Sequence, residues 1–223
     1  MTTLDWTPAH LPQPRLLQGH HVRLEPLDPD RHGADLWQAL HDQDPALWDY
    51  LPYGPFTEQA AFATWLTGLA EGRDPLFYAV VDPQDGRALG QLSLMSIVPE
   101  HGSIEIGHVA FGGRLQRTPL ATEAFHLLMQ EAFALSYRRL EWKCDDANAR
   151  SKRAAERLGF SHEGLFRQHR VVKGRNRDTA WFSLLDHEWP GVDAGFRRWL
   201  AAENFDAAGH QLSALAVTAG HTS

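Results

Sequence analysis

One stretch of the sequence combines residues that begin a helix with residues that attract an anion. In residues 115–125 (LQRTPLATEAF), Thr118 can cap a helix and Pro119 suits its first position. The free amides of a helix start carry partial positive charge that attracts phosphate, and Arg114 and Arg117 would add to it. An ordinary capped helix with solvated arginines explains the same residues, so this stretch alone leaves both interpretations open.

A second stretch, residues 144–160 (CDDANARSKRAAERLGF), carries an amide and a hydroxyl on one predicted helix face. Asn148 and Ser151 are three residues apart, so both can reach the same ligand. The alternative is structural: Asn148 caps the helix and Ser151 belongs to its first turn. Cys144 is the single cysteine, which excludes an intramolecular disulfide and a thiolate-rich zinc site, and we expect it to be a small buried residue.

The composition indicates one globular domain with neither a metal nor a nucleic-acid partner. The 223 residues are 43% hydrophobic and 22% charged, and a net charge of −7 argues against a basic nucleic-acid-binding surface. The 13 histidines are scattered without a His-Glu-x-x-His spacing, so no catalytic metal is expected. The sequence starts without signal-peptide features and has no apolar run near the ~20 residues of a membrane span. We therefore expect a cytoplasmic protein with no membrane partner.

The elements that would position these stretches are typical of an α+β (mixed α/β) fold. Alternation and turn residues predict strands at 21–27, 76–82, 87–97, 103–111, 138–145, 160–173 and 179–189. Helical spacing predicts helices at 30–42, 58–72, 118–136, 148–159 and 191–205. Hairpins are predicted at Asp85-Gly86 and at 174–178 (GRNRD). The long helix between strands 103–111 and 138–145 requires a crossover, so these two strands should be parallel.

We expect one domain with an extension at each end. Residues 1–19 form an N-terminal arm, 20–189 the domain, 190–206 a C-terminal helix and 207–223 a mobile tail. Little hydrophobic periodicity marks the first segment, and Ala, Gly, Thr and His dominate the last. Both chemistry-bearing stretches fall in the central segment.

Residues 20–189 resemble the GNAT superfamily of acyl-CoA N-acyltransferases, in particular its ribosomal-protein N-terminal acetyltransferases. The resemblance is carried by SIEIGHVAF (103–111), LQRTPLATEA (115–124) and RLEWKCDDANARSKRAAERLGFSHEG (139–164). The subgroup's Asn-x-x-Ser before a helix that ends in Leu-Gly-Phe is matched within 148–160. The resemblance implies a GNAT-like fold: a mixed, mostly antiparallel sheet of six to seven strands with a splayed parallel pair, flanked by about four helices.

The resemblance also implies acetyl-CoA as co-substrate and no metal. In the family, the amides of a Gln/Arg-x-x-Gly-x-Gly/Ala turn hold the CoA pyrophosphate, and here Pro119 replaces the central glycine. Pro119 lacks an N–H but has a helical φ, so the remaining amides and an arginine can still bind the anion. By resemblance, the cofactor-binding residues are Val109, Ala110, Phe111, Arg114, Gln116, Arg117, Thr118, Leu120, Ala121, Thr122, Asn148, Ser151 and Arg153.

Three residues are implied in proton transfer. Relatives often use a hydroxyl one turn into the short helix, here Ser151, to assist the leaving thiolate, and a backbone N–H of the splayed strand to polarise the carbonyl. In some relatives an acid on that strand, here Glu105, deprotonates the amine through water, and Asp178 is a second candidate. A solvent-facing glutamate, and a turn-forming aspartate paired with Arg175 or Arg177, explain these two residues equally well.

The resemblance predicts acetyl transfer to a primary amine, with protein N-terminal amines as the leading class. A small-molecule amine or amino acid is the alternative acceptor. A non-catalytic CoA-binding regulator is the alternative class of protein, which Pro119 keeps open. The acceptor would lie against the two N-terminal helices and the aromatic residues of 48–56 (WDYLPYGPF), which could equally be core. A homodimer is also expected, because the subgroup often dimerises.

Overall fold

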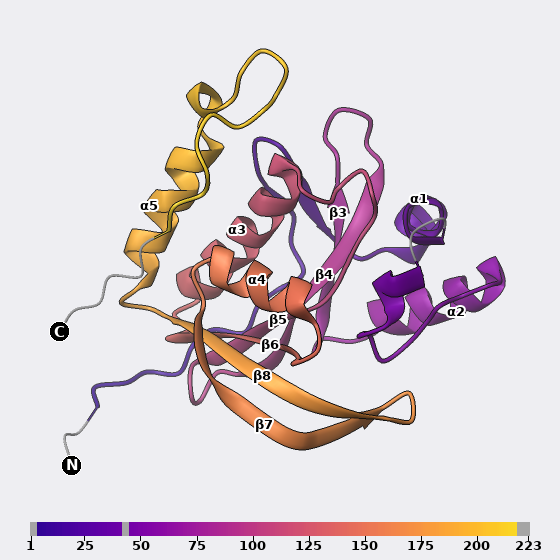
Figure 1. The fold of residues 1–223 in the computed structure, drawn as a ribbon, viewed down its shortest axis with the longest axis horizontal. Coiled ribbons are helices and arrows are strands. Elements are labelled where there is room, and N and C mark those ends of the chain that lie inside the picture. Colours follow the sequence, from indigo (N-terminus) through magenta and orange to yellow (C-terminus); the bar gives the residue numbers. More distant parts are fainter. Residues whose placement is uncertain (1–3, 42–44, 218–223) are drawn as a thin grey trace.

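The computed structural model describes residues 4–41 and 45–217, and these form one mixed sheet with helices on both faces (Figure 1). The strands are β1 (Leu17–Gln18), β2 (Arg23–Pro26), β3 (Leu76–Val81), β4 (Ala88–Val98), β5 (Ser103–Phe111), β6 (Arg139–Asp145), β7 (Ser161–Val172) and β8 (Arg175–Leu185). The α-helices are α1 (Pro29–His41), α2 (Gln59–Ala70), α3 (Pro119–Ala134), α4 (Ala149–Arg157) and α5 (Trp189–Leu200). Short 3-10 helices are η1 (Pro45–Trp48) and η2 (Ala202–Asn204). Within these ranges, no helix is long and apolar enough to cross a membrane.

The strand order is β1-β2-β3-β4-β5-β6-β8-β7, and every neighbouring pair is antiparallel except β5 and β6. The predicted mixed sheet, with a crossover through α3 and one parallel pair, is confirmed. Eight strands in the described part of the chain exceed the expected six to seven, whereas the α-helices are the four expected in the domain and the expected C-terminal helix. The additional strand, β1, has 2 residues and is too short to leave a periodic sequence pattern.

The parallel pair opens soon after it begins. Residues 103–105 pair with 139–141, and no later described residue of β5 pairs with β6. On its other side, β5 has one residue more than β4 between Gly107 and Ala110, and within this bulge His108 has a φ of 53°. Because a bulge bends the strand that carries it, the C-terminal halves of β5 and β6 diverge.

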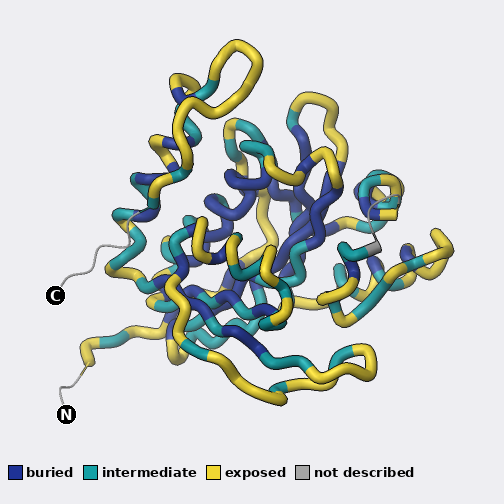
Figure 2. Tube along the Cα trace, viewed as in Figure 1, coloured by how far each residue is buried: buried dark blue, intermediate teal, exposed yellow. Residues whose placement is uncertain are grey.

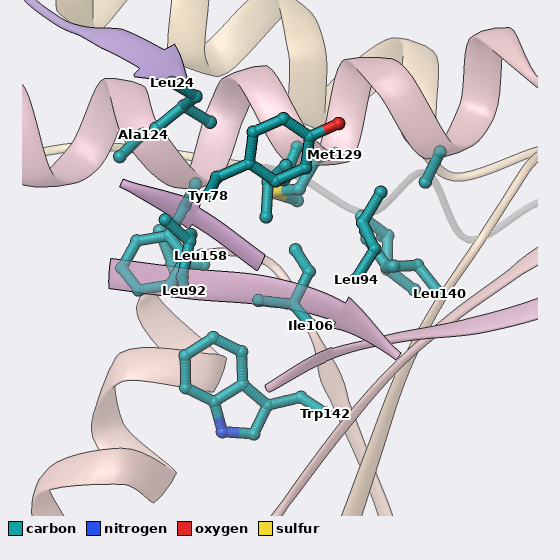
Figure 3. Packing of buried hydrophobic residues seen from close by; sticks show 14 of the residues in the cluster. Leu24, Tyr78, Leu92, Leu94, Ile106, Ala124, Met129, Leu140, Trp142 and Leu158 are labelled. Atoms are coloured by element: carbon teal, nitrogen blue, oxygen red, sulfur yellow. The ribbon is translucent and has the colours of Figure 1, made fainter. Parts of the chain in front are cut away.

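Each face of the sheet has its own core. Under α3 and α5, Tyr78 and Ile106 of the strands pack near Met129 of α3 (Figure 3). On the other face, Leu66 of α2 packs in a smaller cluster that contains Phe77 of β3. Figure 2 shows the central strands and α3 as the most buried part of the molecule, and the β7–β8 hairpin as largely exposed. The divergence of β5 and β6 therefore lies at the edge of a rigid core.

Local sequence sets the starts of α3 and α4 as predicted. The Thr118 hydroxyl accepts a hydrogen bond from the Ala121 amide, and the Asn148 side chain accepts one from the Ser151 amide. Gly159 follows α4 with a φ of 95°, the left-handed conformation with which glycine commonly ends a helix. Both helix starts are thus fixed by their own residues before any ligand contributes.

The last hairpin differs from the prediction. The connection expected at 174–178 is wrong, because β8 already begins at Arg175 and the turn consists of Lys173 and Gly174. Both turn residues have positive φ values, 49° and 72°, as tight hairpin turns require. Near the tip, both strands are exposed on both faces. Their sequence therefore lacks the alternation of polar and apolar residues that marks a strand, and it looks like that of a loop.

Both extensions contact the domain. In the N-terminal arm, the Ala9 and His10 amides donate to the carbonyls of Pro99 and Leu135. Beyond α5, Leu215 and Val217 pack against the larger core. The predicted mobility of the tail stays a prediction, and residues 218–223 lie outside the described residues.

Candidate active site

A cavity of about 1380 Å³ occupies the opening between β5 and β6. Its walls come from the loop at 46–52, the start of α3, helix α4, the β7–β8 hairpin and the segment after α5. Predicted site residues that line it are Glu105, Val109, Phe111, Gln116, Arg117, Thr118, Ala121, Thr122, Asn148, Ser151 and Arg153. The fold thus brings most of the predicted residues to one place.

Four predicted residues lie outside the cavity lining. Ala110 points into the smaller core, and Leu120 packs against the larger one. The Arg114 guanidinium lies 3.0 Å from Asp85 and 3.5 Å from Asp82, at the β3–β4 turn. These contacts direct all three side chains away from the cavity. The fourth, Asp178, belongs to the hairpin.

At one end of the cavity, the start of α3 keeps unused backbone donors. The Ala121 amide is bound by the Thr118 side chain, and the Thr122 amide by the Thr118 carbonyl. Among the described residues, the amides of Arg117, Thr118 and Leu120 make no hydrogen bond. Arg117 has a φ of 62°, so a non-glycine residue holds the left-handed conformation that turns the chain here. The proline removes one donor and leaves three.

Helix α4 turns arginines toward the same end. Arg157 approaches the Thr122 hydroxyl at 3.3 Å and lies 5.3 Å from the centre of the Trp199 ring. Arg150, Arg153 and Arg157 all line the cavity, and none of the three has a carboxylate within 4.0 Å among the described residues. Arg157 was not predicted as a site residue. Its spacing of four from Arg153 and seven from Arg150 places the three on one helix face, and this signal would have identified it.

The Ser151 hydroxyl accepts a hydrogen bond from a neighbouring strand. The Trp142 indole donates to it at 2.9 Å. Cys144 is buried beside it, and burial raises the pKa of the Cys144 thiol, as expected for a residue that is not a nucleophile. Asn148 caps α4, which confirms the structural interpretation of this residue, and it also lines the cavity.

At the other end of the cavity, Glu105 is held in an ion pair. Its Oε2 accepts from the Lys143 ammonium at 2.9 Å and from the Ser96 hydroxyl at 3.1 Å. Lys143 also lies 2.7 Å from Glu141 and 4.2 Å from the centre of the Trp181 ring. Glu105 is only 6% exposed, and the Lys143 ammonium compensates its buried charge. Its other oxygen, Oε1, has no hydrogen bond among the described residues and can receive one.

His108, which sequence reasoning missed, also lines this end. It occupies the bulge of β5, and its Nδ1 lies 2.9 Å from the Tyr53 hydroxyl. Burial lowers the pKa of His108, so the imidazole is neutral near pH 7 and can accept a proton. Nothing in the sequence separates this histidine from the twelve others, because the bulge that places it is a feature of strand pairing.

Asp178 is not brought to the cavity. Its Oδ1 accepts from the Gln168 amide at 2.7 Å and from the Asn176 side chain at 2.9 Å. These hydrogen bonds lower the pKa of the Asp178 carboxyl. Residues 177, 179 and 181 of β8 line the cavity, so alternation along the strand turns Asp178 to the opposite face.

The aromatic residues of 48–56 divide between core and cavity. Trp48 and Phe56 pack in the smaller core, and Tyr53 packs with them. Tyr50 lines the cavity, and its hydroxyl donates to the Ala147 carbonyl. The loop therefore closes over the cavity with Leu47, Tyr50, Leu51 and Pro52, whereas its other aromatic residues belong to the core. Among the described residues, no group of three or more His, Cys, Asp or Glu side chains could hold a metal ion.

The cavity lies where β5 and β6 diverge, beside the unused amides of α3 and the Ser151 hydroxyl. This fold and this site are those of an N-acyltransferase. The pattern of the Acetyltransferase (GNAT) domain matches residues 21–161. A crystal structure of a GCN5-related N-acetyltransferase from Brucella melitensis is 48% identical, with a TM-score of 0.93 over 95% of this chain and 96% of that one.

Two relatives from Bacillus are also similar. "Uncharacterized N-acetyltransferase p20" of Bacillus licheniformis is 30% identical over 153 residues, which make up 66% of this chain and 85% of the relative. "Putative ribosomal N-acetyltransferase YdaF" of Bacillus subtilis (strain 168) is 31% identical over 108 residues, or 48% of this chain and 58% of the relative. The chain belongs to the GNAT family of acetyltransferases, and the resemblance stated from its sequence is confirmed.

Proposed function

We propose that this enzyme transfers an acetyl group from acetyl-CoA to the N-terminal amine of a protein. The observation that carries the proposal is the divergence of β5 from β6 after Glu105, beside the Ser151 hydroxyl. An extended thioester arm fits such an opening, because a strand without a neighbour can pair with the amides of the arm.

The starts of α3 and α4 would hold acetyl-CoA, which supplies the activated acyl group. The unused amides of Arg117, Thr118 and Leu120 suit a pyrophosphate, and the Arg157 guanidinium adds a charged donor. Val109 would lie along the pantetheine arm. This set fits the co-substrate without the glycine that Pro119 replaces.

The amine proton and the departing thiolate would be handled at opposite walls of the cavity. The amine nitrogen forms a bond to the carbonyl carbon and loses a proton, and the carbon–sulfur bond breaks to release a thiolate. We assign the amine proton to His108, in the tautomer whose Nδ1–H donates to Tyr53 and whose Nε2 is free. Glu105 would orient the amine or a water through its unbonded Oε1. The Ser151 hydroxyl would donate a hydrogen bond to the departing thiolate, which takes its proton from solvent.

The acceptor is the more specific part of the proposal. A relative named as a ribosomal N-acetyltransferase supports a protein N-terminus. One wall of the cavity is the largely exposed β7–β8 hairpin, which also suits a chain end better than an enclosed small molecule. A small amine or amino acid is the alternative acceptor.

We also propose that the protein is cytoplasmic and forms a homodimer. Light scattering tests the dimer.

Release of free thiol from acetyl-CoA, measured with short peptides, small amines and free amino acids, tests the proposal. We expect turnover with peptide amines at a kcat/KM at least about tenfold above that of small amines, because contacts beyond the amine add binding energy. Faster turnover of small amines would favour the alternative acceptor.

Thermal unfolding with and without CoA separates the enzyme from a regulator. Binding to the folded state alone raises the melting temperature. Stabilisation by CoA without turnover of any amine would favour a non-catalytic CoA-binding protein. Absence of stabilisation would contradict both proposals.

A further inference from the structure

Two arginines face each other across the β7–β8 hairpin at the acceptor end of the cavity. Arg170 and Arg177 are directly paired in the antiparallel ladder, and both line the cavity. Like charges opposite each other on neighbouring strands destabilise a hairpin. Their pairing therefore needs an explanation other than stability, and a bound anion between or beside them would supply one.

Among the residues that the structure describes, no carboxylate compensates this pair. In the described part of the chain, neither Arg170 nor Arg177 has a carboxylate oxygen within 4.0 Å, and the same holds for Arg167 and Arg175 of the hairpin. Asp178 binds an amide and an asparagine instead. Residues 161–185 contain five basic and two acidic side chains, although the whole chain carries −7. The hairpin is thus a basic surface on an acidic protein.

The other described carboxylates near this end are already engaged, and one of them, Asp145, accepts from the Ala147 amide at 2.9 Å. Glu105 is ion-paired with Lys143, and the charge of Asp49 acts on Lys173 at the hairpin tip. The Nε of Arg177 and the Nε1 of Trp181 are buried and have no partner among the described residues. This wall of the cavity therefore presents hydrogen-bond donors in excess over acceptors, which is the chemistry that recognises a carboxylate.

The hairpin is held in place above the cavity. The Lys173 ammonium donates to the Trp48 carbonyl at 2.7 Å, which fixes the tip against the loop at 46–52. Two apolar side chains of β7 are exposed on this fixed element, Phe166 at 52% and Val171 at 79%. A site that does not have to be ordered on binding loses less affinity to conformational entropy.

We propose that Arg170 and Arg177 bind an acidic side chain close to the acceptor amine, so that the substrates are proteins with acidic N-terminal segments. This inference rests on the proposed function, because it assumes that a chain end enters the cavity. An extended peptide fits better than a free amino acid, since Arg175, two residues from Arg177 on the same face of β8, and the exposed Phe166, which packs on Trp181, continue the surface beyond the pair. The first acidic residue would meet the arginine pair, and later ones would follow the hairpin.

Two short synthetic peptides that differ only in Glu or Gln at their second and third positions test the inference by calorimetric binding and by thiol release. We expect the acidic peptide to bind at least about tenfold more tightly at low salt, because a charge-assisted hydrogen bond contributes that much or more. The preference should shrink as salt screens the charges. The Arg170→Gln, Arg177→Gln double variant should bind both peptides alike and fold at least as stably as the wild type.

The matched control is Arg198→Gln, which removes an exposed arginine of α5 and should leave the preference unchanged. Equal binding of both peptides by the wild type, or equal loss in the control, would overturn the inference while leaving acetyl transfer intact. Acidic peptides that bind through the arginine pair without being acetylated would instead contradict the proposed function. Stronger binding of a short RNA oligonucleotide than of the acidic peptide would overturn the carboxylate as ligand.

Discussion

At the scale of single residues, the direction of hydrogen bonds decides what Ser151 can do. An indole N–H can only donate, so the bond from Trp142 uses a lone pair of the Ser151 oxygen, and the hydroxyl proton, which faces the Cys144 thiol, can turn to a ligand. Ser151→Ala should therefore lower kcat by roughly 10- to 100-fold while CoA affinity changes little, because a hydrogen bond to the charged thiolate is lost and the backbone contacts remain. Thiol release at saturating acetyl-CoA, together with calorimetric binding of CoA, measures both effects.

Cys144 provides the control for this prediction. It is a buried neighbour of Ser151, and its thiol has no part in the proposed chemistry. Cys144→Ala should leave kcat within about twofold. Ser151→Ala with full turnover would remove Ser151 from the mechanism, whereas Ser151→Thr should keep part of the activity because it keeps the hydroxyl.

Arg117 combines backbone strain with a charge at the cavity. A non-glycine residue with a φ of 62° costs roughly 1 kcal/mol relative to glycine, so Arg117→Gly should raise the free energy of unfolding by about that amount. The same change should weaken CoA binding, because the guanidinium at the start of α3 is lost. Denaturant unfolding and calorimetric CoA binding would show the two effects in opposite directions.

Arg114→Ala is the comparison for Arg117→Gly. Arg114 was predicted from the sequence to bind the cofactor, but the structure pairs it with Asp82 and Asp85. We expect Arg114→Ala to leave CoA affinity unchanged. An equal loss of affinity in both variants would support the sequence-based assignment over the geometry.

Residue types in a motif could be predicted, whereas residues placed by packing could not. Asn148 and Ser151 have the predicted cap geometry because that geometry depends only on the first turn of one helix. His108 depends on a bulge between two strands, and the exclusion of Asp178 depends on which face of β8 it occupies. Sequence alone gives no distance between strands, so it could not choose between these proton acceptors.

At the scale of elements, the crossover and the starts of α3 and α4 follow from local signals such as Thr118-Pro119 and Asn148. The prediction missed two features whose residues show little alternation of apolar and polar side chains. These are the two-residue strand β1 and the exposed start of β8 at Arg175. Contacts between helices were not predictable either. The link between α3 and α5 is one such contact, and it carries a titratable group.

His126 of α3 should make stability depend on pH. Its Nε2 lies 2.7 Å from Asp193 of α5, and burial lowers the pKa of His126 below its ordinary value. When the pH falls through about 6.5, the unfolded chain takes up a proton that the folded protein does not, so the free energy of unfolding should decrease on acidification. The slope contributed by this group is at most about 1.4 kcal/mol per pH unit.

Denaturant unfolding of the wild type and of His126→Gln between pH 7.5 and 5.5 tests the sign. Glutamine does not titrate, so the variant should lose less stability on acidification than the wild type. His101→Gln, at an exposed turn, should keep the dependence of the wild type. Identical slopes for all three proteins would show that another group causes the pH dependence.

At the scale of the whole molecule, the cavity is assembled from distant parts of the chain. The family pattern ends at residue 161, yet the hairpin and the segment from Trp199 to Gln211 supply further walls. Trp199 donates to the Gln211 side chain at 3.0 Å, which brings the turn after α5 toward Arg157. The part of the chain that carries no family motif therefore closes the end of the cavity assigned to the cofactor.

Asn204 holds this C-terminal segment together, and its removal should affect both stability and cofactor affinity. Its side chain donates to the Trp199 carbonyl at 2.9 Å and accepts from the Ser213 amide at 3.0 Å, and the residue is 8% exposed. Asn204→Ala leaves both partners without a bond, so we expect a loss of about 1–3 kcal/mol. For a chain of this length, each kcal/mol lowers the melting temperature by about 2–4 °C.

The same variant should bind CoA more weakly, because Trp199 and Gln211 would no longer be fixed at the cavity wall. Acceptor KM should not change, since the hairpin and the loop at 46–52 form the other end. Ser213→Ala removes only a hydroxyl of the same turn, keeps its amide and should have a smaller effect. A destabilised Asn204→Ala with unaltered CoA affinity would mean that the segment supports the fold alone, whereas a changed acceptor KM would mean that the two ends of the cavity are not independent.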